Sequence, residues 1–276
     1  MTPRWAPVTK AVVLARGLGT RMRREDAAAA LDDAQAEVAA RGTKAMIPIG
    51  RPFLDYALSA LADAGCTDAC LVIGPEHTDI RDHYTRTSPP TRIRVAFAVQ
   101  QEPRGTADAL LAAEAFAAGD RVLMVNSDNY YPPRALSALR AVAGSGLLGF
   151  ERAALIRESN IEAARVQRYA LLARRADGSL ARIVEKPDAA TAAALGPDAL
   201  VSMNAWVFTP AIYAACRRVT PSSRGELELQ DAVRIAIDDL GERFDVVRVA
   251  AGVLDLSSRG DIASVRERLA GVEARP

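Results

Sequence analysis

The chain has 276 residues, 50% of them apolar, and a formal net charge of +1. That length can bury the core of one large α/β domain or of two small ones. The near-neutral charge provides no basic surface for a nucleic-acid backbone, so we expect no nucleic-acid partner.

Short apolar strands alternate with helical patterns in the first half of the chain. We expect strands near residues 10–15, 69–73, 93–99 and 121–126. Between them, an apolar stripe predicts a helix over 53–64, and a second helix runs from Thr106, as its N-cap, to Ala117. This alternation is typical of βαβ units with a parallel sheet.

The second half of the chain changes to longer strands separated by turns. We expect strands within 147–155, 168–175, 180–187 and 201–208, a strand pair within 244–256, and helices near 188–195, 227–240 and 259–270. The pattern predicts an α/β fold with a mixed central sheet flanked by helices. We expect one domain with a first lobe (1–132), a second lobe (133–258) and a C-terminal helix (259–276).

An alanine-rich stretch, MRREDAAAALDDAQAEVAARG, covers residues 22–42. Its alanines and mixed charges favour a helix. The sequence leaves open whether this helix is a lid over a site or a plain surface insertion.

The first expected strand runs into a glycine-rich turn, LARGLGTRMRRE at residues 14–25. A dinucleotide fingerprint would need a third glycine where Met22 stands, and a Walker A loop would need a lysine that this stretch lacks. Two interpretations remain. One is a turn whose backbone N–H groups, with Thr20 and Arg21, bind an anion, and the other is a plain turn with a solvated arginine.

Lysine is rare in this chain. Of 35 basic residues, only Lys10, Lys44 and Lys186 are lysine. A lysine is a compact point charge that fits against one phosphate oxygen, whereas arginine presents a planar fork. Lys44 and Lys186 lie in motif-like segments and are expected to be functional, and Lys10 is expected to be a surface residue.

Two acids follow short apolar strands, Asp128 in NSDN and Asp255 in LDLSS. Ligands of open α/β sheets bind at the carboxyl ends of strands, so both acids are expected to face the crevice of the glycine turn. Such a pair of carboxylates suits Mg²⁺ shared with substrate phosphates, although SDN is also good turn chemistry. His77 and His83 have no catalytic motif around them and are expected to be solvated.

Three cysteines, Cys66, Cys70 and Cys216, are an odd number without zinc spacing and suit a reducing compartment. The first residues, MTPRWAPVTK, lack a signal-peptide core, and no apolar run is long enough to span a bilayer. A cytoplasmic protein with no membrane contact is expected.

Several segments resemble motifs of the sugar-1-phosphate nucleotidyltransferases, most closely the glucose-1-phosphate thymidylyltransferase and uridylyltransferase-like group. The segments, in order, are LARGLGTRM, TKAMIPIGRPFLDY, VQQEPRGTADA, NSDN, RYALLARRADGSLARIVEKP and SRGELELQDAV. The similarity runs from about residue 10 to residue 262. It implies a Rossmann-like nucleotidyltransferase fold that binds an NTP and a sugar phosphate, uses Mg²⁺ and leaves a homo-oligomer open.

The resemblance also implies residue roles. Arg21, Lys44 and Lys186 would be catalytic, and Asp128 and Asp255 would hold the metal. The implied nucleotide-binding residues are Leu14, Ala15, Gly17, Gly19, Thr20, Gln100, Gly105 and Thr106. The implied sugar-phosphate residues are Glu185, Lys186, Asn204, Ala170 and Trp206.

The chain departs from the motifs at several positions. Arg16 replaces a small residue in the glycine turn, and Ala170 and Trp206 stand where two glycines would face the sugar. Added bulk at positions where a ligand approaches the backbone reshapes a pocket, so we expect an unusual acceptor phosphate.

Two other functions compete with nucleotidyl transfer. A catalytically inactive relative would bind a sugar nucleotide and act as a regulator, which Arg16 and the lost glycines favour. A glycosyltransferase would want a D-x-D metal pair, and SDN supplies one acid. For the base, the resemblance favours UTP or dTTP.

Overall fold

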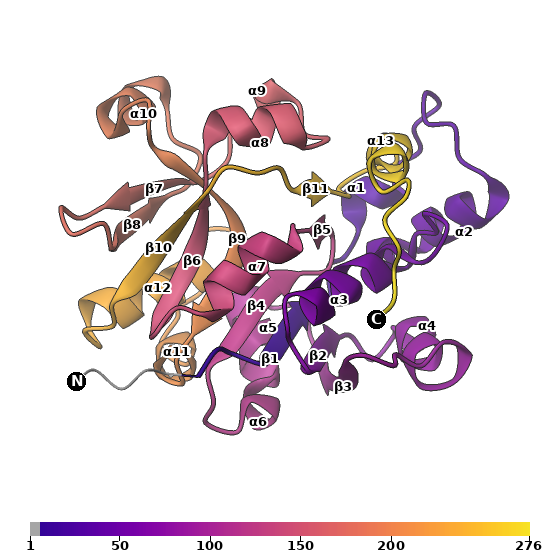
Figure 1. Ribbon diagram of the computed structural model, residues 1–276, viewed down its shortest axis with the longest axis horizontal. Helices are drawn as coiled ribbons and strands as arrows, with labels where there is room; N and C mark the ends of the chain where they lie inside the picture. The colour runs from indigo at the N-terminus through magenta and orange to yellow at the C-terminus, as the bar shows by residue number, and fades with distance from the viewer. Residues whose placement is uncertain (1–5) are drawn as a thin grey trace.

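The computed structural model describes residues 6–276, which fold around a twisted mixed sheet covered by helices on both faces (Figure 1). The main sheet has nine strands, and its central order is β10-β6-β9-β4-β1-β2-β3, with β7 and β8 joined through β9. A separate two-stranded sheet pairs β11 with β5. The strands are β1 (Lys10–Leu14), β2 (Asp68–Ile73), β3 (Arg94–Val99), β4 (Val122–Asn126), β5 (Asn129–Tyr130), β6 (Ser145–Phe150), β7 (Leu171–Arg174), β8 (Leu180–Val184), β9 (Leu200–Phe208), β10 (Phe244–Val249) and β11 (Leu254–Asp255).

The helices divide between the two faces of the sheet and one end. One face carries α3 (Phe53–Asp63), α4 (Thr78–Asp82) with η2 (His83–Thr87), α7 (Pro133–Arg140), α8 (Arg152–Glu158) and α9 (Ala163–Val166). The other face carries α5 (Thr106–Ala112), α6 (Glu114–Ala117), α11 (Ala211–Cys216) and α12 (Leu229–Asp238). Beyond the end of the sheet lie α1 (Thr20–Arg23), α2 (Asp33–Arg41), η1 (Lys44–Met46) and α13 (Asp261–Arg268) (Figure 1). A last helix, α10 (Ala189–Leu195), follows β8.

The order of strands explains where ligands can bind. β1 is parallel to both β2 and β4, and β2 is parallel to β3, so the chain leaves these four strands at the same edge of the sheet. β9 lies between β4 and β6 and is antiparallel to both. The predicted mixed sheet flanked by helices is therefore confirmed.

Two of the predictions about strands differ from the structure. The segment 147–155 holds the end of β6, but α8 begins at Arg152, since Ala153, Ala154 and Leu155 are among the strongest helix formers. The two strands within 244–256 do not pair with each other. β10 lies parallel to β6 and β11 lies antiparallel to β5, and these partners are far away in the sequence.

Thr106 is not an N-cap as predicted. Gly105 occupies that position, and the helix is interrupted at Ala113 between α5 and α6. The Thr106 hydroxyl instead accepts a hydrogen bond from the backbone N–H of Leu229 at 2.9 Å. It thus ties the first turn of α12 to α5.

Only part of the alanine-rich segment is helical. α2 begins at Asp33, where the Asp32 side chain and Gln35 form a reciprocal capping box. Ala39 packs into the same cluster of buried residues as Met22 and Ile47, which anchors α2 to the body of the protein. No described residue between 24 and 42 lines either cavity discussed below.

Across residues 6–276, every helix is too short or too polar to cross a bilayer.

Candidate active site

The loops that leave β1, β3 and β4 surround a cavity of about 370 Å³. This is the edge at which parallel strands of an open α/β sheet present ligand-binding loops. All eight residues expected to bind the nucleotide line it, namely Leu14, Ala15, Gly17, Gly19, Thr20, Gln100, Gly105 and Thr106. Arg21, Lys44 and Asp128 line it too.

Two glycines in the wall of this first cavity cannot be replaced without moving the backbone. Gly19 has φ of 61°, and a Cβ there would lie 2.1 Å from the carbonyl oxygen of Gly42. Gly105 has φ of 120°, and a Cβ would lie 2.5 Å from the carbonyl oxygen of Leu227. Both residues adopt conformations that favour glycine, and both bring two chain segments into contact beside the cavity.

Gln100 is buried beside Gly105. Its amide nitrogen donates to the Gly105 carbonyl at 3.0 Å and to the Asp108 carboxylate at 2.8 Å. Because both partners are acceptors, the orientation of the amide is fixed. The carbonyl oxygen Oε1 is the group that Gln100 can offer to a ligand.

A second cavity of about 620 Å³ adjoins the first. Arg21, Asn126 and Asp128 line both cavities. The second is also lined by Ala170, Glu185, Lys186, Asn204 and Asp255, each of which the sequence assigned to the sugar phosphate or the metal. The glycine turn, both aspartates, Lys44 and Lys186 therefore meet in one pair of adjoining cavities.

Lys44 and Asp128 join at this boundary. The Nζ atom of Lys44 lies 2.7 Å from the Oδ2 atom of Asp128, and the side chains are 14% and 26% exposed. This partial burial strengthens the attraction relative to an exposed pair while leaving both groups within reach of a ligand.

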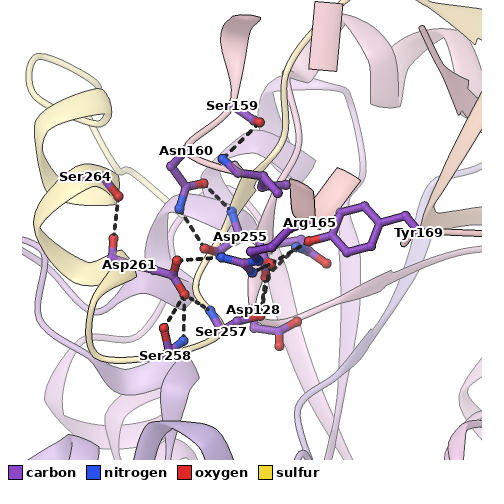
Figure 2. Close-up of polar contacts among 12 residues, drawn as sticks. Asp128, Ser159, Asn160, Arg165, Tyr169, Asp255, Ser257, Ser258, Asp261 and Ser264 are labelled. Atoms are coloured by element: carbon purple, nitrogen blue, oxygen red, sulfur yellow. Dashed lines mark hydrogen bonds and ion pairs between the residues drawn. The ribbon is translucent and has the colours of Figure 1, made fainter. Parts of the chain in front are cut away.

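Asp255 lies at the centre of a polar cluster (Figure 2). Its Oδ2 atom accepts from the Arg165 guanidinium at 2.5 Å and from the Tyr169 hydroxyl at 3.2 Å, and the Ser257 hydroxyl donates to Oδ1 at 2.9 Å. Arg165 also binds Asp261 at 2.8 Å. The cluster connects α9, β11 and α13 around one buried carboxylate.

The two aspartates repel each other. Burial, followed by the negative charge of Asp128, raises the pKa of Asp255, and Arg165 partly opposes this rise. Burial, with a smaller contribution from the charge of Asp255, raises the pKa of Tyr169 to about 12. A divalent cation between the aspartates would relieve their repulsion, so the donor set fits such an ion.

Within residues 6–276, no group of three or more acidic, histidine or cysteine side chains has a geometry that could hold a metal. The remaining ligands would therefore have to come from substrate oxygens or water.

Two residues of the second cavity have unusual backbone conformations. Lys186 has φ of 42° and Asn204 has φ of 57°. Such values are uncommon for residues other than glycine, and strained residues concentrate at ligand sites. Next to Lys186, burial and the charge of Glu228 raise the pKa of Glu185.

Trp206 lies elsewhere, which corrects the expectation that it shapes the sugar side. Its side chain is fully buried and stacks on Phe208, with ring centroids 5.5 Å apart, and Phe244 packs edge-on against it. The ring packs in the buried cluster that β9 forms with α11 and α12, and Trp206 lines neither cavity. Of the two substitutions at glycine positions, only Ala170 faces the cavity.

The two histidines differ from the expectation that they are solvated, and Lys10 agrees with the expectation that it lies outside the site. His77 is not a solvated side chain but half-buried in the wall of the first cavity, and His83 contacts the buried carboxylate of Asp55 at 3.1 Å. Lys10 lies far from the site, where it donates to the Ala117 carbonyl and pairs with Asp120.

Sequence reasoning missed several residues of the second cavity, among them Asn126, Arg165, Arg168, Tyr169, Ser257 and Ser258. Asn126 is the last residue of β4, so its position at a strand end could have indicated it. Arg165 carries no such signal, because its role depends on contact with a residue 90 positions away.

Comparisons with known proteins agree with this geometry. Residues 36–265 match the nucleotidyl transferase family. The chain is 28% identical over 261 residues to UTP–glucose-1-phosphate uridylyltransferase AglF of Haloferax volcanii, covering 94% of this chain and 96% of that protein. It is also 28% identical to a glucose-1-phosphate thymidylyltransferase of Streptomyces griseus, of which it spans 57%.

Solved structures share the fold. A UDP-glucose pyrophosphorylase complexed with UDP-glucose superposes with a TM-score of 0.73 at 17% identity, covering 96% of this chain and all of that one. The family match spans most of the chain, including the loops after β2, β3 and β4 and the helix that carries Asp261. The chain belongs to the nucleotidyl transferase family.

Proposed function

We propose that this protein transfers a nucleotidyl group from an NTP, with UTP or dTTP favoured, to a sugar 1-phosphate or a similar phosphate. The products are an NDP-sugar and pyrophosphate. The observation that carries this proposal is the pair of adjoining cavities whose shared wall contains Arg21 and Asp128. Two substrates that must react with each other need two sites with a common boundary.

The first cavity suits the NTP. Its wall is glycine-rich backbone with Gln100 on one side and Lys44 and Arg21 on the other. The second cavity suits the phosphorylated acceptor, because Lys186 supplies a cation and Asn204 and Glu185 supply neutral and anionic groups for sugar hydroxyls. In the proposed lobes, residues 1–132 hold most of the first site and residues 133–258 most of the second.

Catalysis would consist mainly of alignment and charge neutralisation, as in other phosphoryl-type transfers. Lys186 would orient the acceptor phosphate for in-line attack on the α-phosphorus, with pyrophosphate as the leaving group. Arg21 and Lys44 would neutralise charge that develops on the phosphates. Mg²⁺ bound by Asp128 and Asp255 would add Lewis-acid stabilisation and hold substrate oxygens. No residue forms a covalent intermediate.

The acceptor remains a proposal of its own. Ala170 narrows the second cavity where the related motifs have glycine, so we propose an acceptor other than plain glucose 1-phosphate. The enzyme would act in the cytoplasm, where the three buried, unpaired cysteines would stay reduced.

A pyrophosphate-release assay tests the proposal, with each of the four NTPs and dTTP against a panel of sugar phosphates in the presence of Mg²⁺. We expect turnover with UTP or dTTP. Nucleotide or NDP-sugar binding without pyrophosphate release would favour the inactive regulatory relative instead. Efficient turnover of glucose 1-phosphate would contradict the unusual acceptor while leaving the reaction class intact.

A further inference from the structure

Arg16 lines the first cavity and has no role in the proposed reaction. It stands in the glycine turn after β1, and its side chain is only 7% exposed. One guanidinium nitrogen, Nη2, donates to the Gln101 carbonyl at 3.0 Å and lies 3.5 Å from Glu76. The other two, Nε and Nη1, are buried without a hydrogen-bond partner among residues 6–276.

This arrangement is costly in the free protein. A buried donor that lacks a partner loses its hydration without compensation, and the loss is larger for a charged group. Glu76 is distant for an ion pair and half-exposed. A ligand oxygen entering the cavity would supply the missing partner after a small movement of the flexible Arg16 side chain.

The position of Arg16 indicates which part of an NTP it meets. Its partners, Glu76 and Gln101, come from the loops after β2 and β3, at one side of the parallel strands. Asp128 follows β4, on the opposite side of β1, where the second cavity begins, and Lys44 of η1 pairs with it there. The phosphates belong beside the second cavity, because the acceptor must reach them. Arg16 therefore lies at the end of the cavity left for the base.

Two neighbours define the hydrogen-bonding pattern at that end. Gln100 offers its carbonyl oxygen, because both amide N–H groups are already used. His77 accepts from the backbone N–H of Gly74 at 3.1 Å through Nδ1, so in the neutral ring the proton lies on Nε2. The base thus meets one acceptor and two donors, and a guanidinium can only donate.

We infer that Arg16 selects the base by donating to a keto oxygen, so that uracil and thymine are accepted and cytosine is rejected. This inference rests on the proposed function for the placement of the nucleotide. Uracil presents an imide N–H for Gln100 beside carbonyl oxygens for Arg16. Cytosine presents an amino group where a carbonyl oxygen stands in uracil, and it has no imide N–H. Its amino group would face a donor and leave Arg16 unpaired.

The test is equilibrium binding of UTP and CTP without acceptor, measured by isothermal titration calorimetry. These nucleotides share the ribose and triphosphate, so their affinity ratio isolates the base. The wild type should bind UTP at least about tenfold more tightly than CTP. Arg16→Met should weaken UTP binding by about 10- to 100-fold and CTP binding by less than about threefold. Arg86→Ala, a control at an exposed arginine on η2, should leave both unchanged.

Arg16→Lys provides a second variant that retains the charge in case Arg16→Met does not fold, and it should also reduce the UTP preference, because one compact ammonium replaces the fork. Equal weakening of UTP and CTP, tighter binding of both, or a wild type without preference would each overturn the inference. Selective UTP binding with no pyrophosphate release would sink only the proposed function. Pyrophosphate release with an unchanged UTP preference in Arg16→Met would sink only the role of Arg16.

Discussion

The two cavities differ in how they are built. The first is built mainly from backbone turns, in which Gly19 and Gly105 bring chain segments together. The second is lined by charged and hydroxyl side chains that already bind one another, with Asp255 held by Arg165, Tyr169 and Ser257. The first therefore provides a rigid shape, and the second provides charges whose pairing a substrate or metal must rearrange.

This difference predicts where mutations act. Substitutions at the shared boundary should affect chemistry most, and those in the charged cluster should affect metal binding and stability. Substitution of an uncharged lining residue such as Ala170 should affect only the choice of substrate.

The largest effect is expected for Lys44→Ala. Removing a preorganised cation that stabilises charge in the transition state typically lowers kcat by about 100- to 1,000-fold, and we expect a loss of that size. Steady-state pyrophosphate release measures it. Lys10→Ala is the matched control, because Lys10 is the one lysine whose partners, Asp120 and the end of α6, lie away from both cavities. An equal loss in both variants would mean that the effect comes from stability.

The next effect concerns the metal. Asp128→Asn should weaken binding of a divalent cation by about 10- to 100-fold, because it removes one of the two aspartate carboxylates that line the second cavity. Electron paramagnetic resonance of Mn²⁺ in the absence of substrate measures this without turnover. Asp33→Asn on exposed α2 is the control. Unchanged Mn²⁺ affinity in Asp128→Asn would remove Asp128 from the metal site.

The two cavities also differ in how much of their structure the sequence predicts. The strand ends that line the first follow from local patterns, since apolar runs and glycines mark the end of β1 and the start of the turn. The depth of the first cavity does not follow from local patterns, because Gly19 meets Gly42 only after the intervening segment folds back. The partial burial of His77 could not be predicted either, because His77 lines the cavity together with residues that are distant from it in the sequence.

The second cavity is harder to foresee. Asp255 and Lys186 could be indicated by the resemblance, but their neighbours could not. Trp206 shows why sequence spacing alone does not predict which face of a strand a side chain takes. Its position beside Asn204 in the sequence indicated the sugar side, yet β9 has an irregular register with β6 and a positive φ at Asn204. Such irregularities change which face a side chain takes, and sequence spacing does not reveal them.

Arg165 tests whether the charged cluster is structural. Its side chain is 22% exposed and binds both Asp255 and Asp261. Arg165→Ala leaves a buried carboxylate without its cation, so the free energy of unfolding should fall by about 2 kcal/mol. Urea denaturation measures the change. Arg243→Ala removes an arginine that pairs with exposed Asp177 and Asp245, and it should cause no measurable loss. Similar losses in both variants would show that the cluster is no stronger than a surface ion pair.

The smallest effect is expected at the wall of the second cavity. Ala170→Gly removes one methyl group from a residue that lines this cavity, whereas Trp206→Phe changes a ring in the core behind it. Ala170→Gly should therefore lower the KM for a bulkier sugar 1-phosphate by about three- to tenfold, the scale of one methyl in a binding pocket. Trp206→Phe should leave that KM unchanged. Measuring both with the same acceptor series separates a residue that shapes the pocket from one that only supports the sheet. A larger change in KM from Trp206→Phe would mean that the acceptor site is coupled to the core through β9.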